Sequence, residues 1–273
     1  MDLQGSVTIV TGASSGIGLA VARQLVAAGG RVALVARTKE KLEALAAELG
    51  AGAAAFPLDV MDLRALEALP LAVVARFGRL DAIVNNAGLH HRGDMLRHSP
   101  QELADMFTVN LTAPVVLTRA AADVMGPGAV IVNVASLAGK LGVPGSAVYS
   151  GTKAGLRFWA LAAAEDLGRR GIRIANVNPG PVDTGFFDAD IDHVTDLTFS
   201  QPMRTAEQIA EAVLRCLRSD RSGYDLDVPY LSGKLSTLAY LSPRLARLLR
   251  PALERKGARA KRRYIDRRGL GSG

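Results

Sequence analysis

The sequence has few of the residues that define several protein classes. Cys216 is the only cysteine among 273 residues, which excludes an internal disulfide framework and favours a reducing compartment. The four histidines show no metal-ligand spacing, so we expect no bound metal. No run approaches the roughly 18 uncharged apolar residues of a membrane-spanning helix. The first residues do not resemble a secretory signal, and we expect a cytoplasmic protein.

Excess charge is also scarce outside one segment. The net charge is +7, but residues 244–268 contain eleven lysines and arginines against two acidic residues, a contribution of +9. The rest of the chain therefore carries −2. A nearly neutral body argues against a nucleic-acid-binding face.

The chain does contain a regular alternation of short β-branched runs with stretches of helical periodicity. The runs expected as strands are residues 7–10, 31–36, 53–58, 80–85, 128–134, 173–177 and 225–228. The stretches expected as helices are residues 17–28, 39–49, 62–77, 100–125, 148–168 and 205–218. This order predicts an α/β fold, a doubly wound parallel sheet (Rossmann fold) in three layers. With no linker before about residue 230, we expect one domain over residues 1–230 and a basic C-terminal extension over 231–273.

A glycine-rich turn, Thr11–Gly18, joins the first expected strand to the first expected helix. Glycine permits a positive φ and a close approach to a pyrophosphate, and the helix N-terminus favours negative charge. A plain tight turn is the alternative, but the position after the first strand of an alternating chain favours a dinucleotide site. The residues expected to contact the cofactor are Gly12, Ser14, Ser15, Gly16, Ile17 and Gly18.

The end of the second expected strand indicates which dinucleotide binds. An acidic residue there accepts a hydrogen bond from the ribose 2′-hydroxyl of NAD, whereas a cation accommodates the 2′-phosphate of NADP. This chain has Arg37 at that point, no acidic residue, and Lys41 one helical turn further on. We therefore expect NADP(H) to be favoured over NAD(H), with ordinary surface cations as the alternative.

Tyr149 and Lys153 are four residues apart in an expected helix, so their side chains leave the same helix face. The ordinary pKa of a phenol, about 10, makes it a poor acid–base group at neutral pH. A neighbouring ammonium favours the phenolate and lowers that pKa. Ser136 follows a buried expected strand, at the sheet edge where α/β folds build ligand sites. The alternative is a tyrosine at the edge of the core beside a solvated lysine.

Together these motifs resemble the short-chain dehydrogenase/reductase family, in its compact single-domain branch. The resemblance spans about residues 3–230. It rests on Thr11–Gly18, Asn85–Gly88, Asn110, Ser136, Tyr149, Lys153 and Pro179-Gly180, in the family's order and spacing. It implies that residues 1–230 bind a dinucleotide and transfer a hydride between a nicotinamide cofactor and a carbonyl or secondary alcohol.

The resemblance also implies a role for each matched residue. Tyr149 would exchange a proton with the substrate oxygen, and Ser136 would hydrogen-bond that oxygen. Lys153 would hold the nicotinamide ribose and lower the pKa of Tyr149, and Asn110 would order a water that links Lys153 to solvent. The other implied cofactor contacts are Asp59 and Val60 at the adenine, Asn86, Ala87 and Gly88 along the cofactor, and Pro179, Gly180, Val182 and Thr184 at the nicotinamide.

The loop after Thr184 is apolar for a chain with only 5% aromatic residues. Its apolar side chains are Phe186, Phe187, Ile191, Val194, Leu197 and Phe199. They predict a lid over a lipophilic steroid-, retinoid- or long-chain-like substrate, or equally a segment that packs against the protein's own core. His90, His91 and Arg92 follow the Asn85–Gly88 motif and reach either the mouth of the site or exposed loop positions.

Three other functions are compatible with all or part of this set of residues. A 3-oxoacyl-thioester reductase is the main alternative, although the expected Asp-Gly-Gly turn is replaced by Ser222–Pro229 and about 40 further residues. An epimerase or dehydratase would also use Tyr149 and Lys153, but such relatives usually carry a larger substrate domain. A redox-sensing dinucleotide-binding protein would need no acid–base pair.

The extension predicts a helix that begins at Ser242-Pro243, with Leu245, Leu248 and Leu249 as an apolar stripe beside arginines. Such a basic amphipathic helix can make peripheral contact with an anionic membrane. It can also close the substrate pocket, join a subunit interface, dock an acidic partner or pack along the surface. We expect residues 256–273 to be disordered because they are rich in charge. The family resemblance implies a homodimer or homotetramer.

Overall fold

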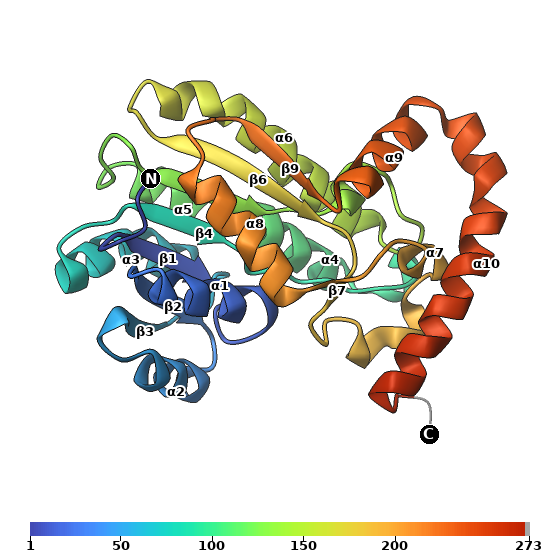
Figure 1. Ribbon diagram of the computed structural model, residues 1–273, viewed down its shortest axis with the longest axis horizontal. Coiled ribbons are helices and arrows are strands. Elements are labelled where there is room, and N and C mark those ends of the chain that lie inside the picture. Colours follow the sequence, from blue (N-terminus) through green and yellow to red (C-terminus); the bar gives the residue numbers. More distant parts are fainter. Residues whose placement is uncertain (271–273) are drawn as a thin grey trace.

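The structure is a computed structural model that describes residues 1–270, and for residues 189, 243, 245 and 246 it describes the backbone alone. At its centre is a seven-stranded parallel sheet of strand order β3-β2-β1-β4-β5-β6-β9 (Figure 1). The strands are β1 (Val7–Thr11), β2 (Arg31–Ala36), β3 (Ala53–Pro57), β4 (Ala82–Asn85), β5 (Val130–Val134), β6 (Arg173–Pro179) and β9 (Tyr224–Val228). The doubly wound sheet expected from the sequence is confirmed.

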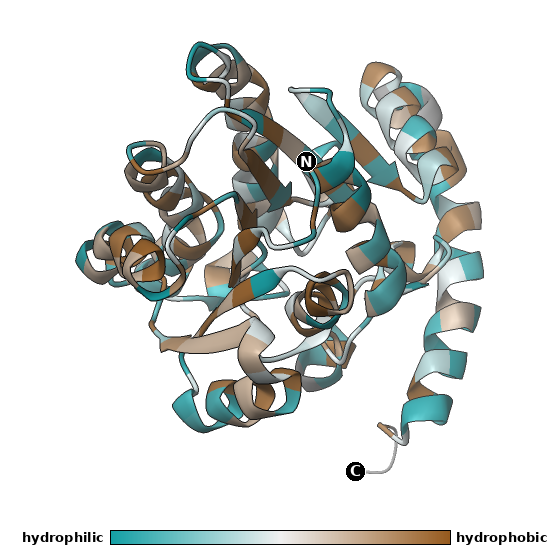
Figure 2. Ribbon diagram, turned by 60° about the vertical axis from the view of Figure 1, so that its left-hand side comes forward, coloured by the Kyte–Doolittle hydropathy of each residue, from teal (hydrophilic) through white to brown (hydrophobic). Residues whose placement is uncertain are grey.

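Helices cover both faces of this sheet and complete three layers (Figure 1). One face carries α1 (Gly16–Ala27), α2 (Lys39–Leu49) and α8 (Ala206–Arg218), and the other carries α3 (Leu63–Phe77), α5 (Ala113–Ala121) and α6 (Ala147–Gly168). The strands are apolar on both faces, as the brown central ribbons in Figure 2 show. Shorter elements are α4 (Pro100–Phe107), α7 (Asp196–Phe199) and the pair β7 (Val182–Asp183) and β8 (Arg204–Thr205).

The strand order reverses between β1 and β4, and α/β sheets bind ligands beside such a point. The amide of Asn86, just after β4, donates to the carbonyl of Thr11 at 2.9 Å. The Thr11 hydroxyl accepts from the backbone N–H groups of Asn86 and Ala87, both at 3.0 Å. These bonds tie together the carboxyl ends of the two strands that border the crevice.

Three buried asparagines at matching register positions cross the sheet from β4 to β6. The amide of Asn85 donates to Asn133 at 2.8 Å, and the amide of Asn133 donates to Asn176 at 3.2 Å. Asn176 in turn donates to the carbonyl of Arg157 on α6 at 3.2 Å. Because buried amides need partners, this asparagine ladder favours one register over its neighbours.

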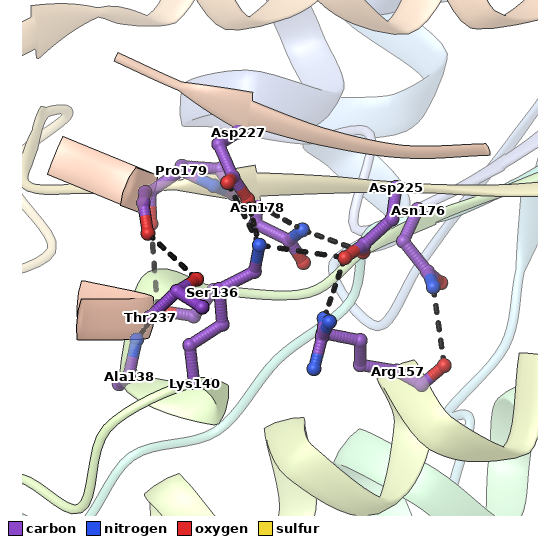
Figure 3. Close-up of polar contacts among 11 residues, drawn as sticks. Ser136, Ala138, Lys140, Arg157, Asn176, Asn178, Pro179, Asp225, Asp227 and Thr237 are labelled. Atoms are coloured by element: carbon purple, nitrogen blue, oxygen red, sulfur yellow. Dashed lines mark hydrogen bonds and ion pairs between the residues drawn. The ribbon is translucent and has the colours of Figure 1, made fainter. Parts of the chain in front are cut away.

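A second polar network joins α6 to the last strand (Figure 3). Asp225 on β9 accepts from Arg157 at 2.7 Å and from Asn178 on β6 at 2.7 Å. Asp227, with a side chain only 10% exposed, pairs with Lys140 at 2.7 Å. Lys140 belongs to the segment after β5, so the network links that segment, α6 and β9.

The C-terminal extension forms α9 (Tyr230–Leu241) and α10 (Pro243–Arg268), the red helix at the right of Figure 1. The expected disorder over 256–273 is wrong up to residue 268; residues 271–273 lie outside the described part, as does the side chain of Leu245 from the expected stripe. Packing is the reason. Tyr264 is buried against the loop before α7, and a Cβ on Gly257 would overlap the backbone of Asp196. No helix in residues 1–270 is long and apolar enough to span a membrane.

Replacing Asp225 with alanine should destabilise the protein, because Arg157 loses its carboxylate partner and Asn178 keeps only Asp227 as an acceptor. Breaking a buried ion pair costs about 3 kcal/mol. Asp123→Ala is the matched control: it removes pairs with two exposed arginines and should cost much less, because surface ion pairs contribute little to stability. Urea unfolding of both variants measures the two losses, and equal losses would contradict the importance of the buried network.

Candidate active site

The glycine-rich turn folds closely onto the N-terminus of α1. Gly12 and Gly16 have positive φ values of 67° and 53°, and a Cβ at Gly18 would overlap the carbonyl oxygen of Gly12. The N–H of Ala13 donates to a carbonyl at the end of β2 at 3.1 Å, which holds the turn against that strand. The Ser15 side chain makes no capping bond to α1. The turn therefore has the form of a phosphate cradle, and it fits a dinucleotide pyrophosphate.

Ser136, Tyr149 and Lys153 meet where the segment after β5 touches α6. The Ser136 hydroxyl accepts from the N–H of Ala138 at 3.1 Å, and its side chain lines the same cavity as Tyr149. Nζ of Lys153 lies 5.8 Å from the centre of the Tyr149 ring and donates to the carbonyl of Val134 at 2.9 Å. A Cβ on Gly139 would collide with the backbone of Lys153. The absence of that atom lets the segment carrying Ser136 approach the helix.

Burial dominates the electrostatics of these groups. It raises the pKa of Tyr149, and the hydrogen bond with Ser136 and the charge of Arg92 oppose that rise. Burial also lowers the pKa of Lys153 to about 8. The expected lowering of the Tyr149 pKa by Lys153 is therefore not found, because desolvation outweighs the neighbouring charges.

Asn110 lies in a π-helical turn, Thr108–Thr112, between α4 and α5. The single helix expected over residues 100–125 is corrected here, because one widened turn interrupts it without disturbing the apolar spacing. The Asn110 side chain accepts from the N–H of Leu89 at 2.8 Å and donates to the Leu89 carbonyl at 2.8 Å. It also donates to the Thr152 hydroxyl at 3.1 Å, which connects the loop after β4 to α6.

One cavity of about 720 Å³ contains most of the expected site. The expected residues that line it are Gly12, Ser15, Gly16, Ile17, Asn86, Ala87, Gly88, Ser136, Tyr149, Lys153, Pro179, Gly180, Val182 and Thr184. Those outside its lining are Ser14, Gly18, Arg37, Asp59, Val60 and Asn110. The glycine-rich turn and the hydroxyl pair of Ser136 and Tyr149 therefore share one space.

The residues expected at the adenosine end lie after β2 and β3. Arg37 is exposed and has no ion-pair partner within the described residues. Asp59 accepts from the N–H of Met61 at 3.0 Å, and Val60 lines a separate small recess. β2 and β3 are neighbouring strands, and Ala13 connects the glycine-rich turn to the end of β2.

Two residues left undecided by the sequence belong to the cavity wall. His90 stacks on Tyr149 with ring centres 4.0 Å apart and planes at 12°. Arg92 is buried and lines the same cavity. Only their position directly after the Asn85–Gly88 motif indicated in the sequence that they could lie at the site. That position is equally compatible with an exposed loop.

The loop after Thr184 lies partly in the cavity wall and partly in a packed cluster, and the lipophilic substrate stays a prediction. Phe186 lines the cavity and is 42% exposed, whereas Phe187 lines the cavity and also packs against Tyr264 of α10. The C-terminal extension contributes to the same cavity wall. Closing the substrate pocket was one of several roles that the sequence allowed for it. Its lining residues are Leu231, Leu235, Ser232, Ser236, Ala239, Leu253 and Lys256.

Metal-ligand side chains gather at one place among residues 1–270, where ligand atoms of His91, His98 and Glu102 lie within 4.8 Å of one another. A Glu102 oxygen already accepts from the backbone and the hydroxyl of Ser99, and Nε2 of His98 lies 2.9 Å from the carbonyl of Arg92. The expectation of no bound metal stays a prediction.

Comparison with known proteins identifies the family. The model of the short chain dehydrogenase family matches residues 6–194. The chain is 35% identical over 228 residues to the ketoacyl reductase HetN of a Nostoc species, covering 80% of this chain and 77% of the relative. It is 32% identical over 230 residues to the 3-oxoacyl-[acyl-carrier-protein] reductase FabG of Escherichia coli, covering 82% and 94%. A short chain dehydrogenase from Burkholderia cenocepacia, solved in complex with NADP, has a TM-score of 0.74 at 32% identity, covering 83% and 97%.

The chain belongs to the short-chain dehydrogenase/reductase family. It is an oxidoreductase of the class that uses a nucleotide cofactor and acts on carbonyl or CH–OH groups. The phosphate cradle and the hydroxyl groups of Ser136 and Tyr149 lie in one cavity, which agrees with that chemistry.

The low pKa of Lys153 should make stability depend on pH. The folded protein loses this proton near pH 8, whereas the unfolded chain keeps it up to about pH 10.5. Between these values the unfolded state binds more protons, so the contribution of Lys153 to the free energy of unfolding should rise with pH, by about 3 kcal/mol at most. Urea unfolding of the native protein and Lys153→Met across this range measures the difference, and a constant difference would contradict the shift.

Proposed function

We propose that the protein is an NADP-dependent oxidoreductase that interconverts a carbonyl and a secondary alcohol on an apolar substrate, with Tyr149 as the acid–base group. The shared cavity carries this proposal, because Ser136, Tyr149, Lys153 and the glycine-rich turn all line it. A phosphate cradle and a half-buried pair of hydroxyl groups in the same cavity suit a cofactor and a substrate held face to face.

The chain's own groups would bind the cofactor and move one proton. When bound, the nicotinamide would supply or accept the hydride. Tyr149 would give its proton to the substrate oxygen in reduction and take it back in oxidation. Ser136 would hydrogen-bond that oxygen as negative charge develops. Lys153 would hold the nicotinamide ribose, and Asn110 would order a water beside it.

The remaining proposed cofactor contacts involve residues that line the cavity and two residues, Asp59 and Val60, outside its lining. The turn around Gly12 would hold the pyrophosphate at the N-terminus of α1. Asp59 and Val60 would meet the adenine. The residues proposed along the rest of the cofactor are Asn86, Ala87, Gly88, Pro179, Gly180, Val182 and Thr184.

Apolar side chains support a lipophilic substrate. Those lining the cavity away from the turn are Leu141, Val143, Phe186, Phe187, Val194, Leu197, Leu231, Leu235 and Leu253. They come from the segment before α6, from the loop after Thr184 and from both helices of the extension. Such walls exclude water from the reacting groups and favour a steroid-, retinoid- or long-chain-like body.

A 3-oxoacyl-thioester reductase is the second candidate. HetN and FabG, two relatives of this chain, are named as reductases of ketoacyl or 3-oxoacyl compounds. Turnover of a free 3-oxoacyl thioester, compared with that of ring ketones, separates the two candidates.

Assembly and location follow as further proposals. Phe107 on α4 and Phe158 on α6 are 45% and 61% exposed, an apolar surface that suits a homodimer or homotetramer. In the extension, Leu238 and Leu241 are also exposed beside basic residues, which suits peripheral membrane contact of a cytoplasmic protein. We place the domain boundary at residue 230, between the catalytic domain and the extension.

Arg37→Ala should weaken binding of NADPH by about tenfold, because the 2′-phosphate loses a charged partner. NADH affinity should not change. Arg64→Ala, which removes an exposed cation from α3, is the control. Calorimetry with both cofactors tests this without a substrate. Equal affinity of the native protein for NADPH and NADH would contradict the preference, and failure to bind either would contradict the enzyme proposal.

Tyr149→Phe should lower kcat/KM for reduction of 2-decanone by about 100-fold or more, because it removes the proton donor and keeps the ring. The dissociation constant of NADPH should stay within about twofold of the native value, since the ring and its stacking remain. Tyr240→Phe, at an exposed position of α9, is the control. Turnover confined to small polar ketones or sugars would overturn the apolar substrate.

A further inference from the structure

Arg92 is a buried cation in the wall of the cavity that holds Tyr149. It lies in the loop after β4, and its side chain is 4% exposed. The guanidinium carbon lies 4.5 Å from the ring centre of Phe186 and 5.2 Å from that of Phe187. Two rings of the loop after Thr184 therefore hold the guanidinium in place.

The hydrogen bonds of this guanidinium are incomplete. Nη1 lies 3.3 Å from the carboxylate of Asp190, which is 43% exposed. Nη2 is buried and has no hydrogen-bond partner within the described residues. A buried donor without an acceptor is unfavourable, because it has lost its hydrogen bonds to water. A ligand that supplies an acceptor would remove this penalty.

His90 provides a second unpaired group near the reacting hydroxyl. Its Nε2 is buried and lacks a partner among residues 1–270. Burial, helped by the charge of Arg92, lowers the pKa of His90 to about 3, so the imidazole is neutral. Because the ring stacks on Tyr149 at 4.0 Å, its position relative to the acid–base group is fixed.

The charge of the cavity has one sign. The ionisable side chains that line it, within the described part of the chain, are Arg92, Lys153, Lys256, His90 and Tyr149, without an Asp or Glu. The function proposed above assigns Lys153 to the cofactor ribose. Lys256 is on α10 and is exposed to solvent. Arg92 is therefore the deeply buried cation left for the substrate. A guanidinium fork binds a carboxylate through two parallel hydrogen bonds.

We propose that Arg92 binds a carboxylate of the substrate, which makes the natural substrate a carboxylic acid with an apolar body and a ketone or secondary alcohol. The inference rests on the proposed function and assigns the far end of the same substrate. The apolar walls hold the body, Arg92 fixes the acid end, and Tyr149 meets the reacting oxygen. Asp190, more exposed than Arg92, balances the guanidinium until the substrate binds.

Calorimetry with decanoate and 1-decanol tests the proposal, in the presence and absence of NADPH. The two probes share a chain and differ in the charged end. The native protein should bind decanoate about tenfold more tightly than decanol, which is about 1.4 kcal/mol. Arg92→Gln should abolish this preference and leave decanol binding unchanged. Arg92→Lys should keep part of it, because the charge remains without the fork.

Arg97→Gln is the matched control, since Arg97 lies exposed five residues further along the same connection. It should keep the preference for decanoate. Unchanged decanol binding shows that the Arg92 variants are folded. Equal affinity of the native protein for both probes, or a preference that survives in Arg92→Gln, overturns the proposal. NADPH-dependent turnover of 2-decanone in that case leaves the proposed function standing. Decanoate preference without turnover of either 2-decanone or 9-oxodecanoate overturns the function alone.

Discussion

The asparagine ladder across β4, β5 and β6 is the interaction on which the position of the site depends. Its amides can pair only when the three strands lie in one register, and a shift by one residue would point them to the opposite face. Asn176 passes this constraint to α6 through the carbonyl of Arg157, and the Arg157 side chain then binds Asp225. Tyr149 and Lys153 are also on α6, so these contacts with the sheet fix where the two side chains lie relative to the strands.

The site contains buried cations, Lys153 and Arg92, whose burial is unfavourable for folding. Its stability therefore depends on interactions of neighbouring residues. Burial raises the pKa of Tyr149 and lowers that of Lys153, which means that each charged form is disfavoured where it stands. Arg92 adds a buried guanidinium with an unpaired Nη2. The ladder and the ion pairs of Asp225 and Asp227 supply the rigidity that holds these groups in place. Buried groups with unfavourable or unpaired polar atoms thus lie at the site, and a network of ion pairs and amide hydrogen bonds lies beside it.

Local signals were sufficient for most of the fold. Strand and helix positions follow from periodicity, and the residues that line the cavity follow from motifs next to strand ends. The π turn at Asn110 was missed because one extra residue in a turn leaves the apolar spacing intact. The burial of His90 and Arg92 depends on Phe186 and Phe187, about a hundred residues away, so no local pattern reports it. The order of α10 likewise depends on a distant contact, at Gly257.

The basic charge of the extension is partly neutralised within the molecule. Arg267 and Arg268 pair with Asp183, Arg268 also pairs with Asp188, and the Tyr264 hydroxyl donates to Asp188 at 2.6 Å. These acids border the loop that covers the cavity. A count of charge by segment treats that loop and α10 as independent, and so it does not show this pairing. Because the structure pairs Arg267 and Arg268 with these acids, α10 supports the cavity wall, and part of its basic charge is already used within the molecule.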